Sequence, residues 1–293
     1  MLNLTAKITN QQGETIGYQV TLNGSTYRDT PDKIAEYISH FPVDMRNCKI
    51  IKNTPCLKKG TLQTIIESPT SDTYVIPADK YQMPVQCNID LAKRNIVDSI
   101  WKSARLEGVA VTYPDTQAIF DGLAVQGIGV NDIQTINNLK HSWRFILENI
   151  SHPLSYPLIC QINQHVGWNL FHEAGKIRNI PVRIGGTDWI PPIPIESQIK
   201  EEIEEIIVSP TSTDRAISLM IYIMRRQMFM DGNKRTALLA ANHLLISSGA
   251  GIITIPIELQ PKFLTLTLDY YKSNNPSEIK RFIYENCIDG ILG

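Results

Sequence analysis

A short polar loop between two apolar helical segments constrains this chain more than any other feature of its sequence. Residues 213–226 and 236–247 carry apolar side chains at helical spacing, so both are predicted to be helices. The loop between them ends in the five residues Asp-Gly-Asn-Lys-Arg at 231–235. Glycine tolerates positive φ, and Asp and Asn side chains hydrogen-bond to their own backbone. The sequence therefore predicts a tight turn that leads directly into the second helix.

This turn is predicted to bind an anion. The free backbone N–H groups at a helix N-terminus, and the positive end of the helix dipole, both favour negative charge. Lys234 and Arg235 add fixed positive charge, and the Asp231 carboxylate can hold a divalent cation beside bound phosphates. The alternative interpretation is a capped helix–turn–helix whose charged pair is simply solvated.

The stretch resembles the signature of the Fic/Doc family, His-x-Phe-x-[Asp/Glu]-Gly-Asn-[Gly/Lys]-Arg. Phe229 and residues 231–235 match it position by position. The resemblance implies a mainly α fold, a Fic/Doc-like helical core with a β-hairpin flap. It also implies transfer of AMP, or of a phosphate in Doc-like members, from a nucleotide to a protein hydroxyl. The expected ligand is ATP or another nucleotide with Mg²⁺. In this family picture Asp231 holds Mg²⁺, and the catalytic loop and the phosphate contacts are formed by Gly232, Asn233, Lys234 and Arg235.

Three positions differ from those of adenylyltransferase-like members of the family. The family has its catalytic His where this chain has Gln227, and a Gln side chain has no titratable proton near neutral pH. Lys234 replaces the glycine of many members, as in Doc-like sequences, and crowds the loop with a point charge. Leu238 stands where adenylyltransferase-like members carry a second arginine. The resemblance therefore predicts a phosphate cradle without its general base.

A second resemblance lies earlier in the chain, at the end of a helix predicted over about 90–107. Ser103, Glu107 and Gly108 match the inhibitory motif of the family, [Ser/Thr]-x-x-x-Glu-[Gly/Asn]. In members with this motif the glutamate pairs with the second arginine and blocks placement of the γ-phosphate. Because that arginine is Leu238 here, the glutamate is expected to reach Lys234 or Arg235 or to be a relic. The alternative is a solvated last-turn glutamate with a glycine cap.

Residues 182–191 are predicted to be the flap, two short strands around a Gly-Gly-Thr-Asp turn. An exposed hairpin edge can bind an extended protein segment through main-chain hydrogen bonds. The expected target contacts are Ile184, Gly185, Gly186 and Thr187. The alternative is an ordinary surface hairpin.

The first part of the chain, 1–85, is predicted to be a small α+β module, and 86–293 the helical domain. Alternating residues predict a β-hairpin within 4–22, followed by a third strand, a helix from Thr30 to about His40, and later strands near 48–51 and 62–66. Residues 68–88 are rich in Pro, Ser and Thr and are predicted to be a linker. The module is interpreted as a scaffold, with target binding or homodimerisation as the alternative.

Composition limits the partners. The net charge of −1 over 293 residues gives no reason to expect nucleic acid or a membrane as an obligate partner. The N-terminus lacks a signal-peptide layout, and the five cysteines form no CxxC pair, so a cytoplasmic protein with reduced thiols is expected.

Three functions follow, in order of preference. The first is a Fic-fold pseudoenzyme that binds a nucleotide and transfers poorly. The second is an active AMP- or phosphate-transferase that uses another base, with His243 the candidate by residue type, although it should lie about 12 Å along the helix from the loop. The third is an antitoxin-like interaction protein whose site binds nothing.

Overall fold

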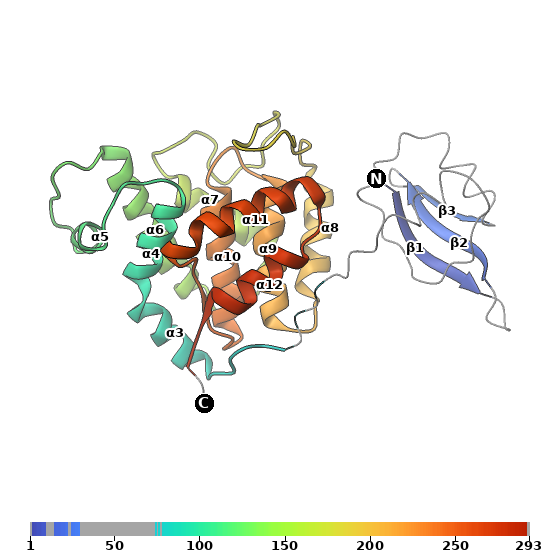
Figure 1. Cartoon of the computed structure of the whole chain (residues 1–293), viewed down its shortest axis with the longest axis horizontal. Coiled ribbons are helices and arrows are strands. Elements are labelled where there is room, and N and C mark those ends of the chain that lie inside the picture. Colours follow the sequence, from blue (N-terminus) through green and yellow to red (C-terminus); the bar gives the residue numbers. More distant parts are fainter. Residues whose placement is uncertain are drawn as a thin grey trace. The chain divides into compact units, whose positions relative to one another are not determined.

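The computed structural model describes residues 2–9, 15–22, 25–29, 74, 76 and 78–291 (Figure 1). The chain divides into two compact units, residues 1–73 with 273–275, and residues 74–272 with 276–293. The helix predicted from Thr30 and the strands predicted near 48–51 and 62–66 lie outside the described residues.

The N-terminal unit contains a three-stranded antiparallel sheet. Strands β1 (Leu2–Thr9), β2 (Thr15–Leu22) and β3 (Ser25–Asp29) pair in the order β1-β2-β3. Val20 of the central strand lies opposite Leu4 on one side and Tyr27 on the other. The predicted hairpin and its third strand are therefore formed.

The second unit is mainly α, as the sequence predicts. Its helices are α3 (Val85–Arg94), α4 (Ile96–Leu106), α5 (Tyr113–Phe120), α6 (Val130–Glu148), α7 (Tyr156–Gly167), α8 (Glu196–Ile207), α9 (Ser212–Arg226), α10 (Asn233–Ser247), α11 (Gln260–Ser273) and α12 (Ser277–Asn286). A 3₁₀ turn (Ile257–Leu259) and two short antiparallel strands, β4 (Ile252–Ile253) and β5 (Ile288–Asp289), complete it. Among the described residues, no helix has both the length and the apolar character needed to cross a bilayer.

Helix α10 forms the centre of this unit. Twelve of its fifteen residues are buried, and it packs against α9, α7, α6 and α3 (Figure 1). A helix that is apolar on all sides is a core helix, and the Ala-Leu-rich sequence of 237–246 supplies such a surface. The polar residues at its N-terminus are consequently held at a fixed place by the surrounding helices.

The helix predicted over about 90–107 is formed as two helices, α3 and α4. Asn95 separates them, and its side-chain Nδ2 and its backbone N–H both donate to the Leu91 carbonyl, at 2.9 and 3.1 Å. The side chain shares this carbonyl with the helical backbone bond, and local side-chain bonds of this kind favour a bend or break in a helix. Helix α4 then ends at Leu106, with Glu107 as its C-cap and Gly108 at φ +82°.

The end of the predicted linker is part of the helical unit. The Met83 amide donates to the Gly249 carbonyl at 2.8 Å, and the Asp79 carboxylate accepts from the backbone amide of Thr213 at 2.6 Å. The described residues from 78 onward are thus anchored to α9 and to the end of α10, where a linker was expected.

Candidate nucleotide site at the start of helix α10

The signature turn joins α9 to α10 through two left-handed residues. Gln227 caps α9 at φ 47°, and Gly232 is the N-cap of α10 at φ 75°. A Cβ atom on Gly232 would lie 2.9 Å from Val166 Cγ1, so both the backbone conformation and the space require glycine there. Met228 and Phe229 are fully buried and anchor the turn in the core.

Asn233 closes the turn on itself. Its Oδ1 accepts from the Phe229 amide at 3.0 Å, while its Nδ2 donates to the Phe229 carbonyl at 2.8 Å and to Gln227 Oε1 at 3.1 Å. Both amide protons are therefore used within the turn. Contact of this side chain with a phosphate stays a prediction, and in this geometry its visible role is to set the shape of the turn.

Gln227 is a hydrogen-bonding residue within the same network. Its Nε2 donates to the Met224 carbonyl at 2.6 Å, and its side chain lies close to the hydroxyl of Tyr271. Burial, with the nearby Glu107 carboxylate, raises the pKa of the Tyr271 phenol well above its ordinary value. The phenol is therefore protonated at neutral pH and is no substitute for a basic imidazole.

Two oppositely charged residues lie at the first turn of α10. Arg235 Nη2 is 3.3 Å from Asp231 Oδ1, and the same carboxylate oxygen accepts the Gly232 amide. The Asp231 side chain is 61% exposed, whereas that of Arg235 is only 8% exposed. The Nε of Arg235 is buried and has no hydrogen-bond partner among the described residues.

Glu107 reaches this turn from the end of α4. Its Oε2 lies 3.1 Å from Lys234 Nζ, so of the partners considered for Glu107 the structure selects Lys234. Ser103, one turn earlier on α4, is buried, and Leu238 lies on the facing side of α10.

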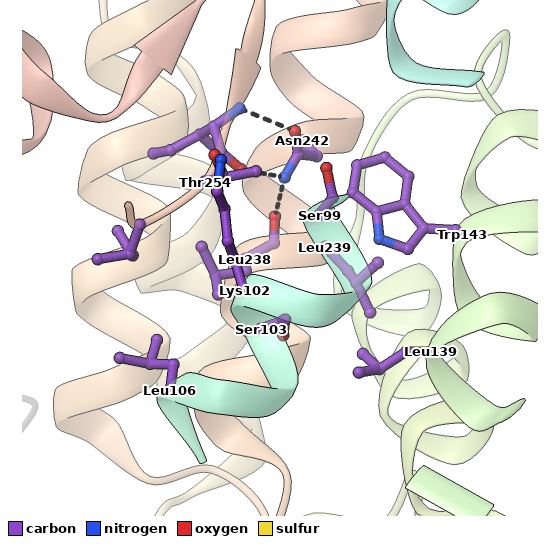
Figure 2. A pocket seen from close by; sticks show the side chains of 12 residues that line it. Ser99, Lys102, Ser103, Leu106, Leu139, Trp143, Leu238, Leu239, Asn242 and Thr254 are labelled. Atoms are coloured by element: carbon purple, nitrogen blue, oxygen red, sulfur yellow. Dashed lines mark hydrogen bonds between the residues drawn. The ribbon is translucent and has the colours of Figure 1, made fainter. Parts of the chain in front are cut away.

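The structure places Leu238 in the wall of a small cavity (Figure 2). Residues from α4, α6 and α10 line it, including Ser99, Ser103 and Trp143, and Asn242 hydrogen-bonds beside it to the carbonyls of Leu238 and Ile253. Its volume is about 10 Å³, roughly the space of a single water molecule. This cavity is too small for a nucleotide, so the signature turn remains the candidate site.

The predicted flap contains no strands. Residues 182–191 form an irregular loop with a turn at Gly185–Gly186, and the hairpin expected there is not formed. Pro181, Pro191 and Pro192, at the two ends of the loop, have no N–H to donate to a partner strand, which disfavours strand pairing there. Gly185 and Gly186 are exposed, and the latter lies against Leu268 of α11, while Ile184 and Thr187 are half-buried.

Arg178 holds this loop in place. It is 2% exposed, and its guanidinium donates to the carbonyls of Gln227 at 2.5 Å, Ile180 at 2.7 Å and Pro192 at 2.7 Å, with a longer contact to Pro191 at 3.4 Å. Its backbone amide donates to the Met228 carbonyl at 3.0 Å. No local sequence pattern distinguishes this arginine from the other charged residues of the segment.

Asn163 of α7 is the second residue that the sequence analysis missed. Its Nδ2 donates to the Asp231 carbonyl and to Thr236 Oγ1, both at 3.0 Å, and its Oδ1 accepts from the Gly175 amide at 2.8 Å. The available signal was a polar residue on the otherwise apolar face of the helix, beside Ile162 and Val166. Asn163 fixes the turn against α7.

Other candidates lie outside the site. The His243 ring is buried and hydrogen-bonds through Nε2 to the Asn149 carbonyl at 3.0 Å, at the end of α6. In the described ranges, no group of three or more His, Cys, Asp or Glu residues is arranged to hold a metal ion. A metal at Asp231 would therefore need further ligands from a bound molecule.

Comparison with known proteins agrees with this geometry. Residues 153–245 match the sequence model of the Fic/DOC family, a segment that contains Asn163, Arg178 and the whole signature turn. This segment of the chain is therefore similar to a Fic/DOC family domain.

Two curated relatives are the proteins named protein adenylyltransferase fic-1 of Caenorhabditis briggsae and of Caenorhabditis elegans. Each is 24% identical to this chain over 174 residues, which is 56% of this chain and 34% of the relative. The matched part thus spans about a third of the length of these relatives.

Solved structures show the same arrangement of helices. Fic-1 from C. elegans superposes with a TM-score of 0.58 at 19% identity, over 69% of this chain and 67% of that one. A Fic domain containing signaling protein from Bacteroides thetaiotaomicron superposes with a TM-score of 0.54 at 16% identity, over 69% and 90%. At identities this low, the superpositions establish a shared fold and nothing more. The activity has to be argued from the site.

Proposed function

We propose that the signature turn binds ATP, or another nucleotide, together with Mg²⁺. The observation that carries this proposal is Arg235, a buried cation whose Nε–H has no acceptor among the described residues. A buried donor without a partner costs about 1–3 kcal/mol, and a phosphate oxygen would satisfy it. The curated relatives are named protein adenylyltransferases, which supports an adenine nucleotide as the ligand.

The residues around Arg235 fit a polyphosphate. Gly232, in the left-handed conformation, is the N-cap of α10. The first backbone N–H groups of the helix follow it, and anions bind favourably at such a helix N-terminus. Asp231 is exposed enough to contribute one carboxylate, and Mg²⁺ commonly takes one or two carboxylates and completes its shell with phosphate oxygens and water. Bound ATP would supply the AMP or phosphoryl group.

We further propose that transfer from this site is slow. Gln227 occupies the position at which the family resemblance expects the general base, and its amide is engaged with Met224 and Asn233. A Gln amide has no group that titrates near neutral pH, so it cannot take a proton from an attacking hydroxyl. General-base catalysis contributes roughly 10²–10⁴-fold, so a protein with an intact cradle can bind nucleotide while transferring little.

The Glu107–Lys234 ion pair supports an inhibitory role for α4. A carboxylate that pairs with Lys234 competes with a phosphate for the same charge.

The exposed Gly185–Gly186 tip of the loop is the proposed contact for a protein target, because the space around Gly185 is open and a Cβ atom built there meets nothing within 4 Å.

Calorimetric titration of the chain with Mg²⁺-ATP tests the binding proposal, with GTP and ADP as further ligands. We expect saturable binding by the wild-type chain and at least a tenfold weaker affinity for Arg235→Gln. The matched control is Arg281→Gln, which removes an exposed arginine of α12. Thermal unfolding of each variant is recorded in parallel. The proposal is wrong if none of the three nucleotides binds the folded wild-type chain.

A further inference from the structure

The way in which Arg178 is buried is unusual for a charged side chain. In the described part of the chain no ion pair joins it to an acid, and all of its hydrogen bonds go to backbone carbonyls. Burial, together with the nearby Arg226, lowers the pKa of its guanidinium. Charge pairing therefore does not explain why Arg178 is buried. The number and directions of its N–H donors explain it.

The prolines of the loop explain why so many donors are needed. The carbonyls of Ile180, Pro191 and Pro192 lie on the two arms of the loop, where a hairpin would satisfy them from a facing strand. Pro181, Pro191 and Pro192 have no N–H with which to do so. The guanidinium fork, which carries five N–H groups in fixed directions, supplies these donors from one side chain.

The same guanidinium also reaches the signature turn. Its Nε donates to the Gln227 carbonyl, and the Arg178 backbone amide donates to the Met228 carbonyl. One residue thus connects both arms of the loop with the left-handed residue at which α9 ends.

A second contact connects the far arm of the loop to Gln227. The Trp189 ring lies under the guanidinium of Arg225, at 4.4 Å, and 5.8 Å from the ring of Tyr271. The hydroxyl of Tyr271 lies close to the Gln227 side chain. The loop therefore contacts the backbone of Gln227 through Arg178 and its side chain through Trp189 and Tyr271.

We propose that Arg178 is a positioning residue that fixes the loop 178–192 and the signature turn to each other as one unit. A displacement of the loop, for example by a docked protein segment, is then transmitted to Gln227. The clamp follows from the contacts alone, whereas its effect on nucleotide affinity rests on the proposed function.

Hydrogen exchange measured by mass spectrometry on the full chain tests the clamp without any nucleotide. The variants are Arg178→Gln and the milder Arg178→Lys, which keeps the charge but loses the fork. Arg183→Gln is the matched control, since it removes an exposed arginine from the same loop. We expect at least tenfold faster exchange in peptides that cover 178–192 and 227–233, with unchanged exchange in α12, and wild-type rates throughout in Arg183→Gln.

Three outcomes would overturn the proposal. Faster exchange in the loop with wild-type exchange at the Gln227 and Phe229 amides would show that the clamp does not reach the turn. A uniform increase over the whole helical unit, or a failure of both Arg178 variants to fold, would assign the residue to general stability. A separate ATP titration of Arg178→Lys reports on the nucleotide, so failure of the proposed function leaves the exchange result interpretable.

Discussion

Glu107 Oε2 and Lys234 Nζ lie 3.1 Å apart and join the C-terminus of α4 to the first turn of α10. Both side chains are partly buried, at 19% and 29% exposed. The pair combines two departures of this chain from its family resemblance, a lysine in the loop and a leucine in place of the second arginine. The inhibitory glutamate of the resemblance therefore keeps a cationic partner, at a different position.

Replacing Glu107 with Gln is expected to strengthen ATP binding. The substitution releases the Lys234 ammonium for a phosphate, and a partly exposed ion pair of this kind is worth up to about 1 kcal/mol, which corresponds to roughly a fivefold change in Kd. Calorimetric titration measures it. Asp98→Asn is the control, because it removes the Asp98–Lys102 pair from the same helix. An unchanged Kd in Glu107→Gln would rule out competition between the carboxylate and the nucleotide.

Gln227→His is expected to gain transfer activity. A His ring at this position has the Met224 carbonyl as an acceptor for one ring N–H and lies close to Asn233, so the existing partners can orient it. General-base catalysis predicts an increase of about 10²–10⁴-fold in label transferred from ATP to protein hydroxyls. Gln227→Asn, which restores no base, is the control. If the His variant binds ATP and still transfers no label, more than the base is missing.

Gly232→Ala is expected to destabilise the helical unit by roughly 1–3 kcal/mol, because it combines a left-handed backbone with overpacking against Val166. Gly185→Ala is a matched control, since its Cβ atom meets nothing within 4 Å and its φ is not positive. Urea unfolding of both variants gives the difference. Equal stability of the two would mean that the turn relaxes to accept a side chain.

The signature turn could be predicted from sequence because its determinants are local. An Asp-Gly-Asn turn between two helical patterns specifies where the chain reverses, and the apolar surface of 237–246 specifies that the second helix is central. The prolines 181, 191 and 192 were equally visible, and they remove backbone donors at both ends of the loop. How the chain between these prolines is held in place depends on Arg178. This residue contacts Gln227 and Met228, about 50 residues further along the chain, and no local sequence pattern indicates such a contact.

The lowered pKa values of two histidines predict that stability falls in mild acid. Burial lowers the pKa of His243 below its usual 6.5, and burial with the nearby His141 does the same for His165. Between pH 6.5 and the folded pKa values the unfolded chain therefore binds more protons than the folded one, so the free energy of unfolding decreases as the pH falls through this window.

Urea unfolding between pH 7.5 and 5 measures this effect, at about 1.4 kcal/mol for each unit of pKa difference. His243→Gln keeps a donor for the Asn149 carbonyl and removes the titrating ring, so it should reduce the slope of stability against pH. The exposed His172→Gln should leave that slope unchanged. The buried ring Nδ1 of His243 has no hydrogen-bond partner among the described residues that would stabilise the charged ring. His243 is therefore expected to contribute to the slope, and an unchanged slope in His243→Gln would place the proton uptake at other groups.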